Sequence, residues 1–305
     1  MGKTLRFGAE DNKKRPETKI FGIGGAGRNI LSTLIKDKSV TNMSFFEIGE
    51  NRRFSEGSYI DINKREIREY YDSIFSVGKT TPNHSVEKIK RFIENGELFY
   101  VLSGLGGETG SWTTPICSKM AVKQGFTMSF VAIPFRSEGK SRSTLAEESK
   151  KNLSKNCDVL GVFENSRLLE MNPHLPMTKA FEVMNTIIML PVKDFNAVMT
   201  KGDMPHLRKF CSDVDGFRIG AGYGKGRKRG RRASEEAYRS PWLESPERYD
   251  TVLTVVTSGK GTAELEAEDA LDVIREKSPK ADIMWGLRKD PSIGERTRVT
   301  LLAGI

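Results

Sequence analysis

The stretch Ser103–Pro115, SGLGGETGSWTTP, decides the fold that this sequence predicts. It follows the apolar run Leu98–Leu102 and precedes a segment of helical pattern, Ile116–Lys123. A glycine-rich turn between a strand and a helix can cradle phosphate, because bare backbone N–H groups and a helix N-terminus both attract anions. The loop also carries a carboxylate, Glu108, and an indole, Trp112, which a simple phosphate cradle does not need.

A second glycine turn lies about eighty residues earlier and has the sequence GIGGAG, residues 22–27. It fits the pattern G-x-G-x-x-G, which is typical of dinucleotide sites, with Glu47 or Glu50 available for a ribose. A tight turn without any ligand is the alternative for this motif alone. Two glycine turns, each at the end of a predicted strand, favour a nucleoside triphosphate held across the sheet edge. The pattern G-x-x-x-x-G-K-[ST] does not occur, so the loop is not a P-loop.

The order of predicted elements indicates an α/β protein. Strand-like segments alternate with helical ones up to about Asp158, which favours a parallel sheet covered by helices on both faces. A long helix is predicted over 176–200, with a kink or break at Pro191. The predicted domains are a flexible N-terminal leader (1–18), a nucleotide-binding domain (19–175), the central helix (176–200) and a C-terminal α+β domain (201–305).

Composition restricts the function classes. The formal charge of +9 favours anionic partners. No apolar run approaches the length of a membrane-spanning helix. The three cysteines and three histidines are scattered, so no metal site is predicted and a reducing cytoplasm is the expected location.

Five further segments complete a recognisable order of motifs: IPFRSEGKSR (133–142), FENSRLLE (163–170), AFEVMN (180–185), AYRSPWLE (237–244) and IMWGLRKDPSIGERTRVTLLAG (283–304). With the two glycine turns, they resemble the FtsZ/tubulin family of GTP-binding polymer proteins, and FtsZ more closely than tubulin. The resemblance extends from Lys19 to Ile305. It implies a Rossmann-like GTP-binding domain, a long central helix and a smaller α+β C-terminal domain.

The resemblance also implies a pocket for GTP or GDP, with magnesium as a further ligand. Two groups of residues would surround the phosphates and sugar: Gly24, Gly25, Ala26, Gly27, Arg28 and Asn29; and Gly106, Gly107, Glu108, Thr109 and Gly110. Glu138 and Arg142 would hold the ribose side, and Asn165 would lie against the nucleoside.

On the predicted central helix, Phe181 would stack on the base and Asn185 would read its edge. Residues i and i+4 face the same way on a helix, and an Asn side chain can distinguish guanine by pairing a donor and an acceptor together. An ordinary core aromatic is the alternative for Phe181 taken alone.

Three departures from the family pattern affect the phosphate end. Glu108 replaces a glycine of G-G-G-T-G-[ST]-G, either pointing to solvent or needing a cation, for which Arg28 is the candidate. Trp112 replaces the last glycine of that signature and caps the loop, packs on a neighbouring subunit or fills the crevice between helix and sheet. In EIGENRR, Gly49 and Asn51 stand where the family has the Asn and Asp of A-I-N-T-D, which predicts weaker positioning of magnesium.

The fourth departure concerns the acidic loop N-x-D-x-x-D that family members insert into a neighbour's nucleotide site to promote hydrolysis. The preferred alignment places Asp203 on the first acid and His206 on the second, in a shortened connection. A shifted frame would make Asp194 the acid instead. Phosphoryl transfer depends on positioning and charge placement, so we expect weak or absent GTP hydrolysis.

The sequence thus predicts a guanine-nucleotide-binding cytoskeletal protein that assembles with itself or co-assembles with an FtsZ-type protein. The alternatives are an active polymerising GTPase of cell division and a nucleotide-independent scaffold. The scaffold would bind anionic membrane, nucleic acid or an acidic partner through the basic run Lys225–Arg232, KGRKRGRR. Few aromatic residues accompany that run, which disfavours nucleic acid. A dinucleotide-dependent oxidoreductase ranks last, because no acid–base set accompanies the first turn.

Overall fold

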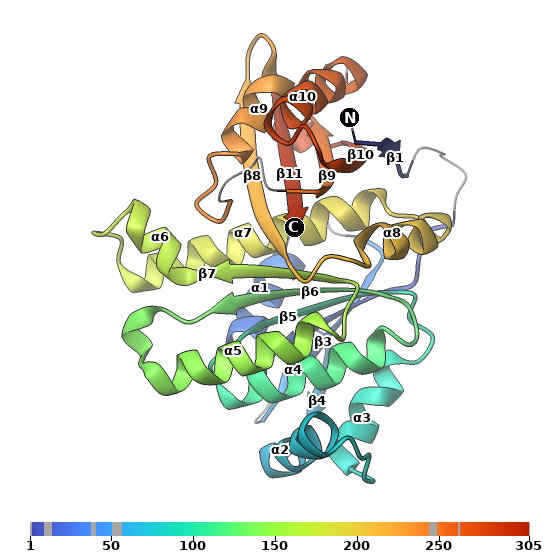
Figure 1. The fold of residues 1–305 in the computed structure, drawn as a ribbon, viewed down its shortest axis with the longest axis vertical. Coiled ribbons are helices and arrows are strands. Elements are labelled where there is room, and N and C mark those ends of the chain that lie inside the picture. The colour runs from blue at the N-terminus through green and yellow to red at the C-terminus, as the bar shows by residue number, and fades with distance from the viewer. Residues whose placement is uncertain are drawn as a thin grey trace. The chain divides into compact units, whose positions relative to one another are not determined.

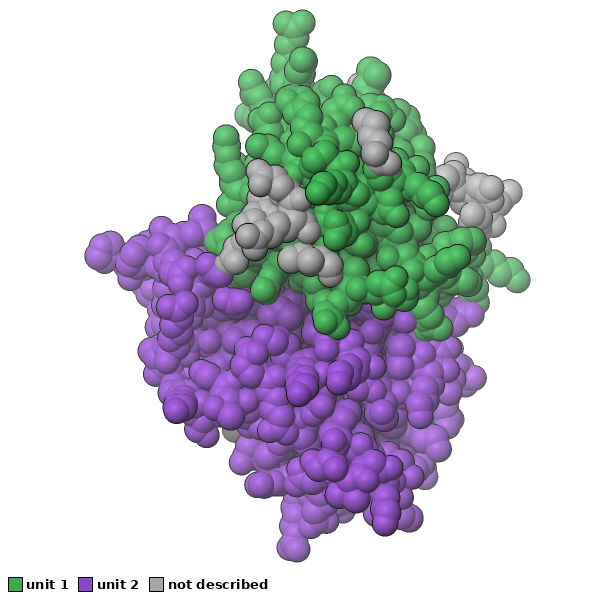
Figure 2. Space-filling view, in the orientation of Figure 1, with its two compact units in different colours: residues 1–15, 190–305 green, residues 16–189 purple. Residues whose placement is uncertain are grey.

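A computed structural model describes residues 2–8, 14–37, 41–50, 57–243, 249–261 and 263–304. The chain forms two compact units, coloured separately in Figure 2. Unit 2 comprises Pro16–Met189, and unit 1 comprises Met1–Arg15 with Leu190–Ile305. Each unit has its own set of hydrogen-bonded strands and its own buried apolar cluster.

Unit 2 is built on a parallel sheet in the order β7-β6-β5-β2-β3-β4 (Figure 1). Its strands are β2 (Thr18–Ile23), β3 (Met43–Gly49), β4 (Ser58–Asp61), β5 (Leu98–Gly104), β6 (Phe126–Ile133) and β7 (Val159–Glu164). The central strand β5 is buried almost throughout, as expected for a parallel strand covered on both faces. The strand order reverses between β2 and β5, and ligands of such sheets bind at this switch point.

Helices connect these strands: α1 (Gly24–Lys36), α2 (Lys64–Asp72), α3 (His84–Ile93), α4 (Glu108–Ala121), α5 (Lys140–Ser154) and α6 (Asn165–Met171). Helices α4 and α5 lie side by side on one face of the sheet (Figure 1). Helix α1 covers the other face, because right-handed crossovers that move in opposite directions from the switch point place their helices on opposite faces. The predicted alternation of strands and helices is confirmed.

Helix α7 (Met177–Val198) follows α6 and is continuous through Pro191. A break at Pro191 is therefore wrong, and a kink at this position stays a prediction. A proline costs a helix one N–H bond and some crowding, which surrounding packing can outweigh. Here the flanking Leu190 and Val192 are both buried, so tertiary packing holds the helix through this position.

Unit 1 contains a mixed sheet in the order β1-β10-β9-β11-β8, with β11 antiparallel to both of its neighbours. Its elements are β1 (Thr4–Arg6), α8 (Met204–Cys211), β8 (Phe217–Lys225), α9 (Arg229–Ala237), β9 (Thr251–Ser258), α10 (Ala263–Lys277), β10 (Asp282–Lys289) and β11 (Arg296–Gly304). Helices α9 and α10 pack together and against this sheet, with a core that includes Val256, Leu271 and Leu301. Part of the segment 1–18 is thus the ordered strand β1, which pairs with β10.

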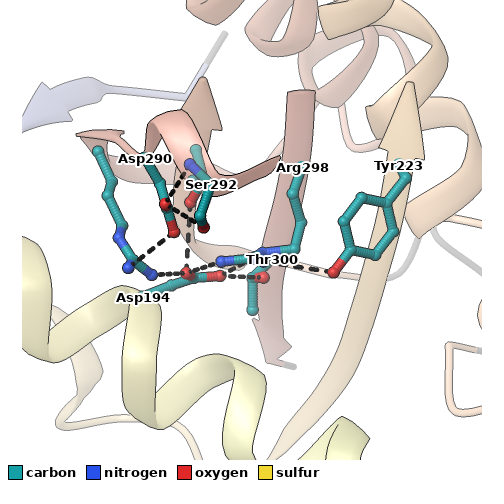
Figure 3. A network of polar contacts seen from close by, with 8 residues as sticks. Asp194, Tyr223, Asp290, Ser292, Arg298 and Thr300 are labelled. Carbon is teal, nitrogen blue, oxygen red and sulfur yellow. Dashed lines mark hydrogen bonds and ion pairs between the residues drawn. The ribbon is translucent and has the colours of Figure 1, made fainter. Parts of the chain in front are cut away.

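A buried ionic network joins the C-terminal turns of α7 to the sheet of unit 1 (Figure 3). Asp194 on α7 is fully buried. Its carboxylate accepts hydrogen bonds from Arg288 at 2.8 Å and from Nε and Nη2 of Arg298. Thr257 and Thr300 donate to the same carboxylate. Burial alone would lower the pKa of Arg298, but its pairing with Asp194 raises that pKa above the ordinary arginine value. The network fixes the end of α7 within unit 1.

Among the described residues, no helix has an apolar stretch long enough to traverse a bilayer.

Candidate functional site

A pocket of about 590 Å³ opens at the carboxyl ends of β2, β5 and β6 in unit 2. Its volume is within the range of small-molecule sites. The lining residues come from both glycine turns, from the loop after β6, from the N-termini of α2 and α6, and from α7: Ile23, Gly24, Gly25, Ala26, Ile30, Lys64, Gly104, Leu105, Gly106, Gly107, Glu108, Thr109, Gly110, Ala132, Pro134, Glu138, Arg142, Asn165, Phe181, Met184, Asn185 and Ile188. The pocket therefore brings most of the predicted site residues together.

The first glycine turn presents the N-terminus of α1 to the pocket. Gly24 has a φ of 68°, in the left-handed region that glycine adopts without strain. The cap residue Ile23 has no side-chain hydrogen bond to the helix, so the first N–H groups of α1 have no side-chain cap. A Cβ built on Gly25 would meet no heavy atom closer than 4.0 Å, so space is left beside this backbone.

The second glycine loop presents the N-terminus of α4 in the same way. Its cap residue, Gly107, has no side chain to bond the helix N–H groups, and a Cβ built on Gly107 would meet nothing within 4 Å. The N–H of Gly106 is used internally and donates to Ser111 Oγ at 2.8 Å. Two helix N-termini without side-chain caps therefore border one cavity, an arrangement that attracts a polyanion.

The opposite end of the pocket offers groups suited to a nucleoside. Phe181 is 44% exposed and contacts Phe135 edge-to-face, with ring centroids 5.5 Å apart. It is therefore not a core aromatic, and its partly exposed ring lines the pocket. Asn185 lies one turn later on the same helix and also lines the pocket. Asn165 is only 5% exposed, yet its Oδ1 has no hydrogen-bond partner among the residues that the structure describes, which leaves an acceptor open to a ligand.

Glu138 and Arg142, which were predicted to hold the ribose side, form a fixed pair. Glu138 Oε1 accepts the N–H of Phe135 at 2.8 Å, and Arg142 donates to Glu138 Oε2 at 2.5 Å. The loop after β6 is thereby held by its own side chains.

Three predicted residues are absent from the pocket lining. Gly27 packs on β5, where a Cβ would come within 2.4 Å of the Leu102 carbonyl oxygen, so its role is close approach of α1 to the sheet. Asn29 is exposed on α1. Arg28 lies 3.9 Å from the buried carboxylate of Glu47. Burial raises the pKa of Glu47, and the Arg28 guanidinium counteracts that shift.

Within the described parts of the chain, the cation beside Glu108 is Lys64 and not Arg28. Lys64 Nζ lies 3.7 Å from Glu108 Oε2 and 3.2 Å from Glu50 Oε2. Sequence reasoning missed Lys64, because the motif Asn63-x-x-Glu66 indicates only that a helix begins here. It does not show that this helix begins beside the second glycine loop.

Trp112 is buried in the core of unit 2, in one cluster with Ile67, Tyr71 and Ile116. Of the three predicted alternatives, this burial agrees with filling the crevice between helix and sheet and not with packing on a neighbouring subunit. Arg68 covers the indole at 5.2 Å from the ring centroid.

The residues of the predicted activating loop lie in unit 1. Asp203 is buried, and its Oδ2 accepts hydrogen bonds from Thr200 N at 2.9 Å, Thr200 Oγ1 at 2.6 Å and Gly8 N at 3.2 Å. His206 is exposed on α8, with Nδ1 3.3 Å from the Gly202 carbonyl oxygen. Asp194, the acid of the shifted frame, belongs to the buried arginine network. A part for these residues in hydrolysis stays a prediction.

The loop after β3 lies only partly within the described residues. Gly49 accepts the Tyr59 hydroxyl at 2.7 Å and the Ile62 N–H at 3.1 Å through its carbonyl oxygen. Asn51 lies outside the described residues. Within the described parts of the chain, no group of three or more His, Cys, Asp or Glu side chains could hold a metal ion.

The basic run Lys225–Arg232 is only partly a solvated loop. It includes the first turn of α9, where Arg229 pairs with Glu266 and with the carbonyl oxygen of Glu295 at 2.6 Å. Arg231 pairs with Glu276 at 2.7 Å. These arginines serve unit 1 internally, and binding of an anionic surface by the rest of the run stays a prediction.

Comparisons with known proteins agree with this geometry. The family described as "Tubulin/FtsZ family, GTPase domain" matches residues 70–173, and "FtsZ family, C-terminal domain" matches residues 217–305. "Cell division protein FtsZ 1" of Archaeoglobus fulgidus is 30% identical over 93% of this chain and 80% of its own length. The protein of the same name from Pyrococcus horikoshii is 29% identical over 93% and 79%.

Two solved structures show the same fold. The "FtsZ dimer, empty (M. jannaschii)" superposes with a TM-score of 0.82 at 24% identity, covering 96% of this chain and 89% of the other. The GDP-bound monomer of CetZ1 from Haloferax volcanii gives a TM-score of 0.72 at 15% identity, covering 95% and 94%. Together with the relatives and the family matches, they show that the chain belongs to the FtsZ/tubulin family of GTP-binding cytoskeletal proteins.

Proposed function

We propose that this protein binds GTP or GDP in the pocket of unit 2, assembles with copies of itself or with another FtsZ-type chain, and hydrolyses nucleotide weakly. One observation carries the proposal: two helix N-termini without side-chain caps flank glycines whose missing side chains leave open space. Packing against the residues that the structure describes does not require glycine at Gly25 or Gly107. A ligand whose phosphates approach the backbone at these positions does.

The nucleoside would lie toward α7, with its base against Phe181. The unpaired Oδ1 of Asn165 would accept a hydrogen bond from the nucleoside, and Asn185 would read the base edge. Glu108 and Glu138 are the carboxylates among the described lining residues. A magnesium ion would therefore be held mainly by the phosphates themselves. A relative described as an FtsZ dimer supports self-association. Three free cysteines suit a reducing cytoplasm.

Base recognition can be tested on α7. Phe181→Ala is expected to weaken GTP binding about tenfold, since stacking on one aromatic ring contributes about 1–3 kcal/mol. Asn185→Ala is expected to reduce the preference for GTP over ATP. Met177→Ala is the matched control, because Met177 is exposed on the same helix and outside the pocket lining. Competition binding with GTP and ATP measures both effects, and unchanged affinities in both pocket variants would reject this orientation of the nucleoside.

Weak hydrolysis can be tested by phosphate release from GTP. Release is expected to stay close to the protein-free background, because the Asp203 carboxylate is buried and already accepts hydrogen bonds from Thr200 and Gly8. His206→Ala is expected to change nothing. Substantial turnover that disappears in His206→Ala would contradict the expectation and identify an active GTPase.

A further inference from the structure

Lys64 is a pocket-lining residue that none of the sequence motifs includes. It is the first residue of α2, and the start of this helix is firmly fixed. The side chain of Asn63 accepts hydrogen bonds from Arg65 N at 2.9 Å and Glu66 N at 3.2 Å. Asn63 N–H donates to Ser85 Oγ at 2.9 Å, which ties the cap to α3. The backbone of Lys64 is thus held in place beside the second glycine loop.

Glu50 and Glu108 both contact Lys64, but Glu50 makes more contacts with it than Glu108 does. Glu50 receives two contacts, from Lys64 Nζ at 3.2 Å and from the Lys64 backbone N–H at 3.1 Å. Glu108 receives only the Nζ contact, at 3.7 Å, and its side chain is 57% exposed. Solvent-exposed ion pairs of this kind contribute little, typically about 0–1 kcal/mol. Glu50 therefore anchors Lys64, whereas the contact with Glu108 is easily exchanged.

We propose that Lys64 is a phosphate-binding residue of this pocket, and that Glu108 holds its ammonium group until the phosphates of a nucleotide replace the Glu108 carboxylate. The inference rests on the proposed function of unit 2 as a nucleotide-binding unit. Glu108 is the first residue of α4, so its carboxylate and a bound phosphate compete for the same ammonium group and the same helix N-terminus. A polyphosphate carries more charge than one carboxylate and wins that competition.

This exchange explains how a glutamate fits a phosphate loop. Glu108 is displaced toward solvent when ligand enters, so its repulsion of the phosphates is relieved by movement. Lys64 supplies the positive charge from an adjacent helix. The alternative role for Glu108 is a magnesium ligand, in which case its removal would weaken binding and not strengthen it.

The two variants that test this inference are expected to change GTP affinity in opposite directions. We expect Lys64→Ala to weaken GTP binding about tenfold, the loss of one charge-assisted hydrogen bond to phosphate. We expect Glu108→Gln to tighten GTP binding about threefold, since a competing carboxylate is removed. Affinities are measured by titration calorimetry of the full chain, once with magnesium and once with EDTA, and thermal unfolding confirms that each variant is folded.

The neighbouring pair Arg65–Glu69 provides matched controls. Arg65 follows Lys64 on α2, is paired with Glu69 at 2.9 Å, and neither residue lines the pocket. Arg65→Ala and Glu69→Gln change the net charge by the same amounts and are expected to leave GTP affinity within about twofold of the original, because exposed charges outside the site are screened by salt.

Unchanged affinity in Lys64→Ala overturns the inference. Weaker binding of Glu108→Gln in magnesium alone also overturns it and identifies Glu108 as a metal ligand. Either result leaves the proposed function standing, because the original protein still binds GTP. Absence of GTP binding by the original protein in both buffers is a different outcome, which rejects the proposed function and this inference together.

Discussion

Replacing Asp194 by alanine is expected to lower the free energy of unfolding by about 3–5 kcal/mol, the cost of removing one partner from a buried ion pair. The carboxylate is fully buried and compensates two arginines that are themselves almost wholly buried, Arg288 and Arg298. Alanine leaves both guanidinium groups without this anion, and Asp290 remains beside only one of them, Arg288, at 2.9 Å. Urea unfolding followed by circular dichroism measures the loss.

Asp272→Ala is the matched control in the same unit. Asp272 pairs with Arg275 at 3.0 Å, but its side chain is 59% exposed. Its removal is expected to cost less than about 1 kcal/mol, because water replaces the lost partner. A loss below about 1 kcal/mol for Asp194→Ala as well would show that the network contributes little to the stability of unit 1.

Replacing Gly107 by serine is expected to weaken GTP binding on the order of a hundredfold while leaving stability within about 1 kcal/mol. Gly107 has φ of −93° and ψ of 146°, which serine adopts without strain, and serine is itself a favourable N-cap. Its Cβ would enter the open space beside the loop, and its hydroxyl would occupy N–H groups of α4 that we assign to the phosphates. Calorimetric titration and thermal unfolding separate the two effects.

Gly110→Ser in the same loop is expected to lower stability, in contrast to Gly107→Ser. A Cβ on Gly110 would lie 2.1 Å from the Gly104 carbonyl oxygen, so α4 must shift away from β5. Overpacking of this kind typically costs about 1–3 kcal/mol, and we expect the loss to appear in the unfolding temperature. If Gly107→Ser binds GTP as tightly as the original protein, the phosphates do not lie against this turn.

Most of the fold follows from local patterns. Five strands of unit 2 (β2, β3, β5, β6 and β7) are short apolar segments that end in turns, and each was predictable from that pattern. Strand β4 and the leader strand β1 are short and carry no alternation of their own, so only their pairing with β3 and β10 reveals them. The helix does not break at Pro191, and the packing of its neighbours Leu190 and Val192 could not be predicted from the proline itself.

In the candidate site, too, some residues were predictable from the sequence and others depended on tertiary packing. Its glycine turns were predictable from their pattern. The pair Phe181 and Asn185 was predicted from the resemblance to the FtsZ/tubulin family, and their spacing places both on one helix face. Lys64 could not be found, since it reaches the second loop only through the fixed start of α2. The ion pair between Arg28 and Glu47 could not be predicted either, because it depends on how α1 packs beside β3.

The guanine-nucleotide pocket is tested most directly by titrating the purified protein with GTP, GDP and ATP in separate calorimetric experiments. The geometry of unit 2 predicts saturable binding of GTP and GDP with dissociation constants in the micromolar range, about −8 kcal/mol, and much weaker binding of ATP. Saturation by neither guanine nucleotide at millimolar concentration, with the fold intact, would contradict the assignment of this pocket.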